Sequence, residues 1–260
     1  MTLLAYPAAA TWYTDRLQAA VITEYHTAVG EQAQEQFLAA LAANEAGDYA
    51  AALRALEVEG SEAIGRILIP SVGIDLPLFP TSTPNDLHRG AGHLQGTAAP
   101  VGGEGTHSAI TAHSGMPTAS MFDRLPEVEK GDVISLHILG HRLTYRVIDT
   151  VVDTPQAGIS RLLPDPTRDL LTLVTCTPYG VNTHRLLVSA ERVGISEAKG
   201  EGKEKNRAFP LWLPLYVSGL TILMIVTRTA LQWPSGRNVA PEQYGRQQPR
   251  HRAPPVSSQR

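Results

Sequence analysis

Hydrophobic residues recur with two different spacings along the chain, and the spacing changes well before its middle. In residues 1–65 they return about every 3.6 residues, as Leu17, Val21 and Tyr25 do, and alanine is frequent. In residues 66–193 they occur in short β-rich runs broken by Gly, Pro, Asn and Asp. The pattern therefore predicts a helical arm followed by a mainly β domain.

Six of the short runs have the length and composition of strands. Many short strands separated by turn signals favour a closed barrel or a sandwich over a parallel sheet with crossover helices. The predicted strands cover residues 67–69, 108–111, 133–139, 143–152, 170–175 and 186–192.

A third pattern follows the β domain. Residues 194–207 are polar without apolar periodicity, which predicts a flexible linker. Residues 208–227 are uncharged and mostly apolar, with Trp212 near one end and Trp233 just past the other. This length and these flanking aromatics predict a transmembrane helix rather than the alternative, a buried core helix. Residues 228–260 form a basic tail.

The net charge of −3 conceals a strong asymmetry. From residue 209 onward six arginines and one acid give +5, while the remaining 16 basic and 24 acidic residues give −8. The positive-inside rule predicts that the tail is cytoplasmic and that the acidic body is extracellular. An acidic body argues against nucleic-acid binding. Because residues 1–13 lack a signal peptide's basic and apolar regions, we expect a translocating membrane segment upstream of this sequence.

The candidate chemistry lies around the single cysteine, which also excludes an intramolecular disulfide framework. Cys176 ends a β-rich run, and Pro178 and Gly180 follow it, so the thiol is predicted at a strand end facing a loop. Arg185 opens the next run, and His113 ends another. Three strand ends could thus bring together a thiol, an imidazole and a guanidinium.

Such a trio suits acyl transfer. Histidine activates a thiol as a nucleophile, and arginine stabilises the negative charge that develops on the attacked carbonyl oxygen. No third residue that would orient the histidine is evident from the sequence. The alternative interpretation of Cys176 is a small buried hydrophobic residue. His107 and His113 share strand parity, but no cysteine or carboxylate cluster joins them, so we expect no metal site.

The same residues carry a family resemblance. TLVTCTPYGVNTHRLLV resembles the active-site signature of the sortases, and GTHSAITAHSG looks like the segment that bears the sortase histidine. GRILIPSVGIDLPLFP and GAGHLQGTAAPVGGEG are similar to the opening strands and to the stretch before that histidine. The resemblance covers about residues 67–193. The TCTPY…NTHR loop, the helical arm and the C-terminal apolar segment resemble class C, the pilus-assembling sortases of Gram-positive envelopes.

The resemblance implies a cysteine transpeptidase on an eight-stranded β-barrel, with no cofactor and no calcium. Cys176 would attack the Thr–Gly bond of an LPXTG-like sorting signal and form a thioester. His113 would be the general acid and base, and Arg185 would steady the substrate carbonyl or the oxyanion. A lysine amine of another pilin would then resolve the thioester. The implied partners are pilin or surface-protein substrates and an amine acceptor.

Two departures and three alternatives accompany this hypothesis. Class C sortases commonly carry a lid with an Asp-Pro-aromatic motif, whereas Asp165-Pro166 here precedes Thr167. Ser114 follows the histidine where arginine is frequent in the class.

The alternatives are a housekeeping sortase that uses peptidoglycan amines, a membrane-anchored binding module with a structural Cys176, and a hydrolytic cysteine protease.

Overall fold

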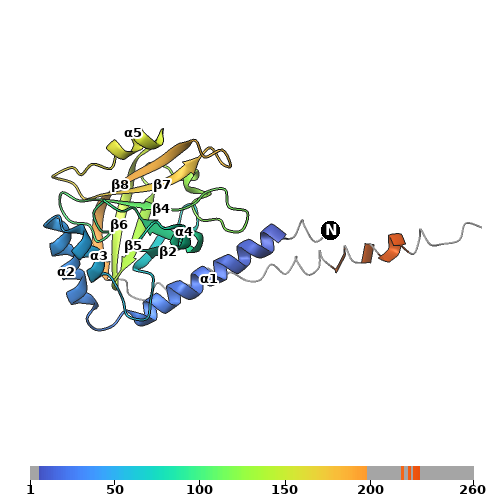
Figure 1. The fold of residues 1–260 in the computed structure, drawn as a ribbon, viewed down its shortest axis with the longest axis horizontal. Coiled ribbons are helices and arrows are strands. Elements are labelled where there is room, and N and C mark those ends of the chain that lie inside the picture. Colours follow the sequence, from blue (N-terminus) through green and yellow to red (C-terminus); the bar gives the residue numbers. More distant parts are fainter. Residues whose placement is uncertain (1–5, 198–217, 220–221, 224, 229–260) are drawn as a thin grey trace, which may run out of the picture. The chain divides into compact units, whose positions relative to one another are not determined.

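A computed structural model describes residues 6–197, 218–219, 222–223 and 225–228, and its described residues up to 197 form one compact unit. Eight strands close into a barrel in the order β1-β2-β3-β4-β7-β8-β6-β5 (Figure 1). The predicted eight-stranded barrel is confirmed. The strands are β1 (Gly65–Ile69), β2 (Ile74–Phe79), β3 (Ala91–His93), β4 (His107–Thr111), β5 (Val133–Ile138), β6 (His141–Asp153), β7 (Leu170–Thr177) and β8 (His184–Glu197).

Most neighbouring strands run antiparallel, but two pairs do not. Strand β2 pairs with β3, and β4 pairs with β7, in parallel. The second parallel pair matters for the site, because the carboxyl ends of β4 and β7 then lie at the same edge of the barrel. The sequence pattern did not indicate either parallel pair.

Helices precede the barrel and interrupt it. The arm contains α1 (Tyr6–Ala28), α2 (Ala33–Glu45) and α3 (Tyr49–Ala55), as predicted, and α1 runs past one side of the barrel (Figure 1). Two further helices, α4 (Pro84–Arg89) and α5 (Pro155–Ser160), lie in connections between strands. Both begin with a Thr-Pro pair whose threonine side chain accepts a hydrogen bond from a backbone N–H, as a helix cap does.

The buried face of the arm differs in part from the predicted one. Tyr25 is fully buried and Val21 packs against the core, but Leu17 is 49% exposed. The side chains of α1 that are buried at helical spacing are Gln18, Ile22 and Tyr25. Two of these side chains find polar partners in the barrel domain: the Tyr25 hydroxyl accepts a hydrogen bond from the Leu139 N–H at 2.7 Å, and the Gln18 amide nitrogen lies 3.2 Å from the Met121 sulfur.

A buried asparagine joins the arm to the loop before β4. The Asn44 side chain donates hydrogen bonds to the carbonyl oxygens of Ala99 and Gly102 and accepts one from the N–H of Ala99. A buried polar side chain is stable only when its hydrogen bonds are made, and these three bonds fix α2 against the barrel. The arm and the barrel therefore fold as one body rather than as two separate domains.

The β domain ends four residues later than predicted, at Glu197 instead of residue 193. Strand β8 continues to Glu197 by pairing with residues 141–144 of β6, so the first four residues of the predicted linker belong to the sheet. The rest of the predicted linker and most of the predicted transmembrane segment, 208–227, lie outside the described residues. In the part of the chain that is described, no helix is long and apolar enough to cross a membrane.

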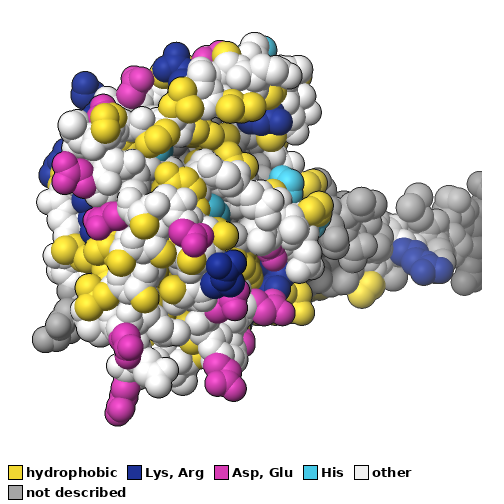
Figure 2. All heavy atoms as spheres, turned by 60° about the vertical axis from the view of Figure 1, so that its left-hand side comes forward, with side chains coloured by type: hydrophobic (Ala, Val, Ile, Leu, Met, Phe, Trp, Pro, Cys, Tyr) yellow, Lys and Arg dark blue, Asp and Glu magenta, His cyan; other side chains and the backbone are white. Residues whose placement is uncertain are grey.

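Charged side chains on one face of the body do not gather into a single patch. On the face drawn in Figure 2, acidic side chains are spread among apolar and uncharged ones, and the basic side chains of the described residues stand apart from one another.

Candidate active site

The strand pairing sets the thiol beside the guanidinium. Cys176 on β7 lies directly opposite Arg185 on β8 in the antiparallel register, and both side chains are partly exposed. Directly opposed residues have Cβ atoms only about 5 Å apart. The loop between these strands turns through Asn182, whose φ is 61°, a value that asparagine tolerates better than most residues. The sequence placed Cys176 at a strand end, and the structure agrees, since β7 ends one residue later.

Across the residues that the structure describes, the Arg185 guanidinium makes hydrogen bonds with backbone carbonyl oxygens only. Its Nη1 donates to the backbone carbonyl oxygens of Asn182 and His184 at 3.2 and 3.0 Å. Asp153 lies opposite Arg185 on the other neighbouring strand, but its carboxylate pairs with Arg161 at 3.1 Å. Within the described residues, no carboxylate neutralises Arg185. A positive charge with spare donors therefore stands next to the thiol.

His113 follows β4, and the parallel pairing with β7 brings its segment to the edge that bears Cys176. Three side-chain hydroxyls lock the two segments together. Thr111 Oγ1 donates to the carbonyl oxygen of Val174 at 3.0 Å, and Thr175 Oγ1 donates to that of Ala112 at 2.9 Å. The third hydroxyl, that of Ser114, donates to the carbonyl oxygen of Cys176 itself at 2.6 Å.

The loop after His113 is also hydrogen-bonded to itself. The N–H of Phe122 donates to the carbonyl oxygen of His113, and the N–H of Gly115 donates to the Asp123 carboxylate at 2.7 Å. Burial raises the pKa of Asp123, and the bond from Gly115 partly offsets that effect. The backbone around His113 is thus fixed on both sides.

Among the described residues, the aromatic ring next to His113 is that of His88 on α4, at a ring-centroid distance of 5.6 Å and an interplanar angle of 78°. Burial and then the charge of His88 lower the pKa of His113 below its usual value of 6.5. His113 is therefore mostly neutral at neutral pH, the form that accepts a proton from a thiol. Sequence reasoning did not identify His88, because its contact with His113 depends on how α4 packs.

His107 does not join this group. Its two ring nitrogens contact the Leu163 carbonyl oxygen and the Thr172 hydroxyl at 3.0 and 2.8 Å. Within the described residues, no group of three or more His, Cys, Asp or Glu side chains is arranged to hold a metal ion. His107 instead lines a cavity of about 220 Å³ with apolar and charged residues of β6, β7, β8 and the segment after α5: Ile148, Asp149, Val151, Arg161, Arg168, Leu170, Leu187 and Ser189.

Comparisons with known proteins identify the family of the chain. The sequence profile of the sortase domain matches residues 67–193. Sortase A of Bacillus anthracis is 30% identical over 142 residues, which cover 55% of this chain and 65% of that protein. The chain thus spans slightly less than two thirds of the length of this curated relative.

Solved structures give the same result and are covered over a larger share of their own length. Sortase C-1 of Actinomyces oris is 49% identical with a TM-score of 0.50, covering 52% of this chain and 76% of that one. Sortase C of Streptococcus pneumoniae is 36% identical with a TM-score of 0.62, covering 67% and 97%. The chain belongs to the sortase family.

Proposed function

We propose that the protein is a cysteine transpeptidase in which Cys176 is the nucleophile, His113 the general acid and base, and Arg185 the stabiliser of the substrate carbonyl. The observation that carries the proposal is the cross-strand pair of Cys176 and an Arg185 without a carboxylate partner among the described residues. The bonds that tie the His113 segment to β7 support the inclusion of the histidine.

The reaction has two steps in which protons and bonds balance. Neutral His113 takes the thiol proton as the sulfur attacks the carbonyl carbon of the Thr–Gly bond in an LPXTG-like signal. Arg185 offsets the charge on the oxygen, and the imidazolium then protonates the glycine amine as the C–N bond breaks. In the second step an acceptor amine attacks the thioester, His113 removes its proton, and the thiol is restored.

Pilus polymerisation is the role we favour. Sortase C of Streptococcus pneumoniae is described with pilin substrates and a group B Streptococcus relative as pilus-related, at 36% identity each. A pilin lysine amine is accordingly the proposed acceptor. The uncharged segment 208–227 and the basic tail fit a membrane-anchored enzyme whose body faces outward. A housekeeping role remains the second candidate, since curated relatives include proteins named Sortase A.

The test offers a choice of acceptors. The full chain is incubated with an LPXTG-type peptide and with a lysine-containing pilin peptide, a peptidoglycan stem peptide bearing a free amine, or neither. A ligated product that forms fastest with the pilin peptide supports the proposal, whereas preference for the stem peptide supports the housekeeping role. Hydrolysis that ignores added amine identifies a protease, and a Cys176→Ala variant that equals the native chain excludes cysteine catalysis.

A further inference from the structure

His113 lacks the usual means of orienting a catalytic imidazole. In a Cys–His system a third group commonly accepts a hydrogen bond from the second ring nitrogen and so fixes the ring. Among the described residues, no carboxylate, amide or carbonyl oxygen makes a hydrogen bond with the His113 ring. The described neighbour that contacts the ring is His88, in an edge-to-face arrangement with centroids 5.6 Å apart.

The ring of His88 is itself held in place. Its Nδ1 lies 2.6 Å from the carbonyl oxygen of Pro84, one turn earlier in α4. A carbonyl oxygen only accepts hydrogen bonds, so Nδ1 carries the proton in the neutral ring and Nε2 is the unprotonated nitrogen. The start of α4 is fixed as well, because Thr83 Oγ1 accepts a hydrogen bond from the N–H of Asp86. His88 therefore presents a ring with a defined position.

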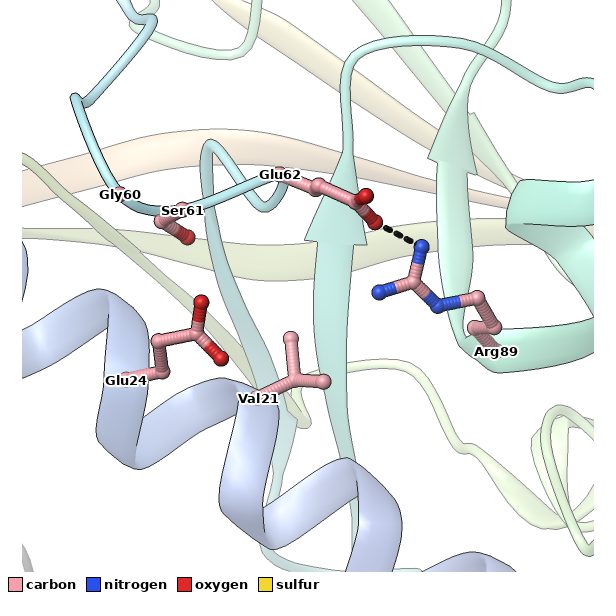
Figure 3. Close-up of a pocket in the computed structure, with 6 residues that line it drawn as sticks. All are labelled: Val21, Glu24, Gly60, Ser61, Glu62 and Arg89. Atoms are coloured by element: carbon pink, nitrogen blue, oxygen red, sulfur yellow. Dashed lines mark hydrogen bonds and ion pairs between the residues drawn. The ribbon is translucent and has the colours of Figure 1, made fainter.

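The far end of α4 is clamped to the barrel by the next residue. Arg89 forms an ion pair with Glu62 (Figure 3). Its guanidinium carbon also lies 4.8 Å from the ring centroid of the buried Phe79. A cavity of about 460 Å³ lies next to this ion pair, and Val21 and Glu24 of α1 line it. Because α4 is anchored at both ends, it can act as a rigid mount for His88.

We propose that His88 is a positioning residue for His113: its ring fixes the orientation in which the His113 imidazole meets Cys176. The inference rests on the proposed function. A ring that turns freely about its side-chain bonds spends only part of its time aligned with the thiol, and restricting it raises the rate of proton transfer without changing substrate binding. The ionisable residues on the elements and loops around the pair are Asp86, Arg89, Asp123, Arg124, Cys176, Tyr179, His184 and Arg185. None of these charges is a cause of the lowered pKa of His113, which comes from burial and from His88.

Two replacements of His88 distinguish an effect of its ring contact with His113 from an effect on the stability of the fold. His88→Ala removes the contact, whereas His88→Phe keeps an aromatic ring but removes its charge and its bond to Pro84. We expect His88→Ala to lower kcat by roughly 3- to 10-fold with KM unchanged, and His88→Phe to recover most of that loss. His141→Ala is the matched control, since it removes a histidine ring stacked on Phe37 at 4.0 Å; we expect its kcat to equal that of the native chain.

A second readout does not require turnover. In the full chain labelled at the histidine Cε1 position, the His113 NMR signal, assigned by its loss in His113→Gln, is titrated with pH. Because His88→Phe keeps the ring contact but removes a like charge, the pKa of His113 should rise in that variant. In His88→Ala the signal should also move toward that of a mobile ring.

The outcomes are unambiguous. The proposal is overturned if His88→Ala and His88→Phe have the same kcat, whether that kcat equals the native value or is lower. It is also overturned if neither variant changes the NMR signal of His113. A chain that shows no transpeptidation at all refutes the proposed function instead, and the NMR titration then still decides whether His88 governs the ring. Thermal unfolding of each variant identifies loss of activity that comes from loss of fold.

Discussion

The hydroxyl of Ser114 donates a hydrogen bond to the backbone carbonyl oxygen of Cys176, with an oxygen–oxygen distance of 2.6 Å. The bond links the residue that follows the proposed base to the proposed nucleophile. It adds to the parallel pairing of β4 and β7, which ends before either residue. The relative position of thiol and imidazole therefore depends on a side chain as well as on the sheet.

Removing this hydroxyl should slow the reaction without unfolding the barrel. We expect Ser114→Ala to lower kcat about fivefold, the equivalent of about 1 kcal/mol for one lost hydrogen bond. Ser114→Thr keeps a hydroxyl and should retain more activity. Steady-state kinetics with a sorting peptide provide the measurement. An alanine variant as fast as the native chain would show that the bond has no role in alignment.

Arg185 should matter more than Ser114, because it meets charge that develops during the reaction. We expect Arg185→Ala to lower kcat by about 100- to 1,000-fold, with a smaller effect on KM. Arg185→Lys keeps the charge but loses the planar set of donors, so it should recover only part of the loss. Rates measured with saturating peptide test this. A change confined to KM would assign Arg185 to substrate binding alone.

The lowered pKa of His113 predicts where activity is lost in acid. Protonated His113 cannot accept the thiol proton, so kcat/KM should fall as pH drops through the pKa of this residue. Burial and the charge of His88 both lower that pKa. The midpoint of the acid limb should therefore lie below about 6.5, the value of an unperturbed histidine. A midpoint above that value, or a flat profile, would count against His113 as the base.

A buried ion pair supports the first hairpin of the barrel. Arg66 on β1 and Asp75 on β2 form two hydrogen bonds of 2.7 and 2.9 Å, with both side chains less than 10% exposed. Asp75→Asn leaves a buried guanidinium without its charge partner, which should reduce the free energy of unfolding by about 3 to 5 kcal/mol. Denaturant unfolding measures this loss. Arg89→Ala, which breaks a far more exposed pair with Glu62, should cost much less.

The sequence predicted the barrel well because most of its strands carry a local signal. The six predicted runs correspond to β1, β4, β5, β6, β7 and β8. Two strands were missed for physical reasons. Strand β2 contains Asp75 and Pro77, and a proline inside a run argues against a strand, whereas β3 has only three residues. The Thr-Pro caps could have identified α4 and α5.

The sequence predicted those site residues that belong to recognisable motifs, but not those brought to the site by packing. The sequence grouped Cys176, His113 and Arg185, and the structure sets Cys176 opposite Arg185 and ties the His113 segment to β7. It treated Ser114 as a departure from the family and gave no hint of His88. The contacts of both residues join segments distant in sequence: Ser114 is 62 residues from Cys176. Such contacts follow from packing, which local periodicity does not encode.

The most direct test of the account is the covalent intermediate on Cys176. The full chain is mixed with an LPXTG-type peptide in the absence of acceptor amine, quenched in acid, and its intact mass is recorded. We predict a mass increase equal to the acyl part of the peptide, located on Cys176, absent from Cys176→Ala and slow to form in His113→Ala. No adduct on the native chain under any condition, or an adduct that persists in Cys176→Ala, would contradict the proposed mechanism.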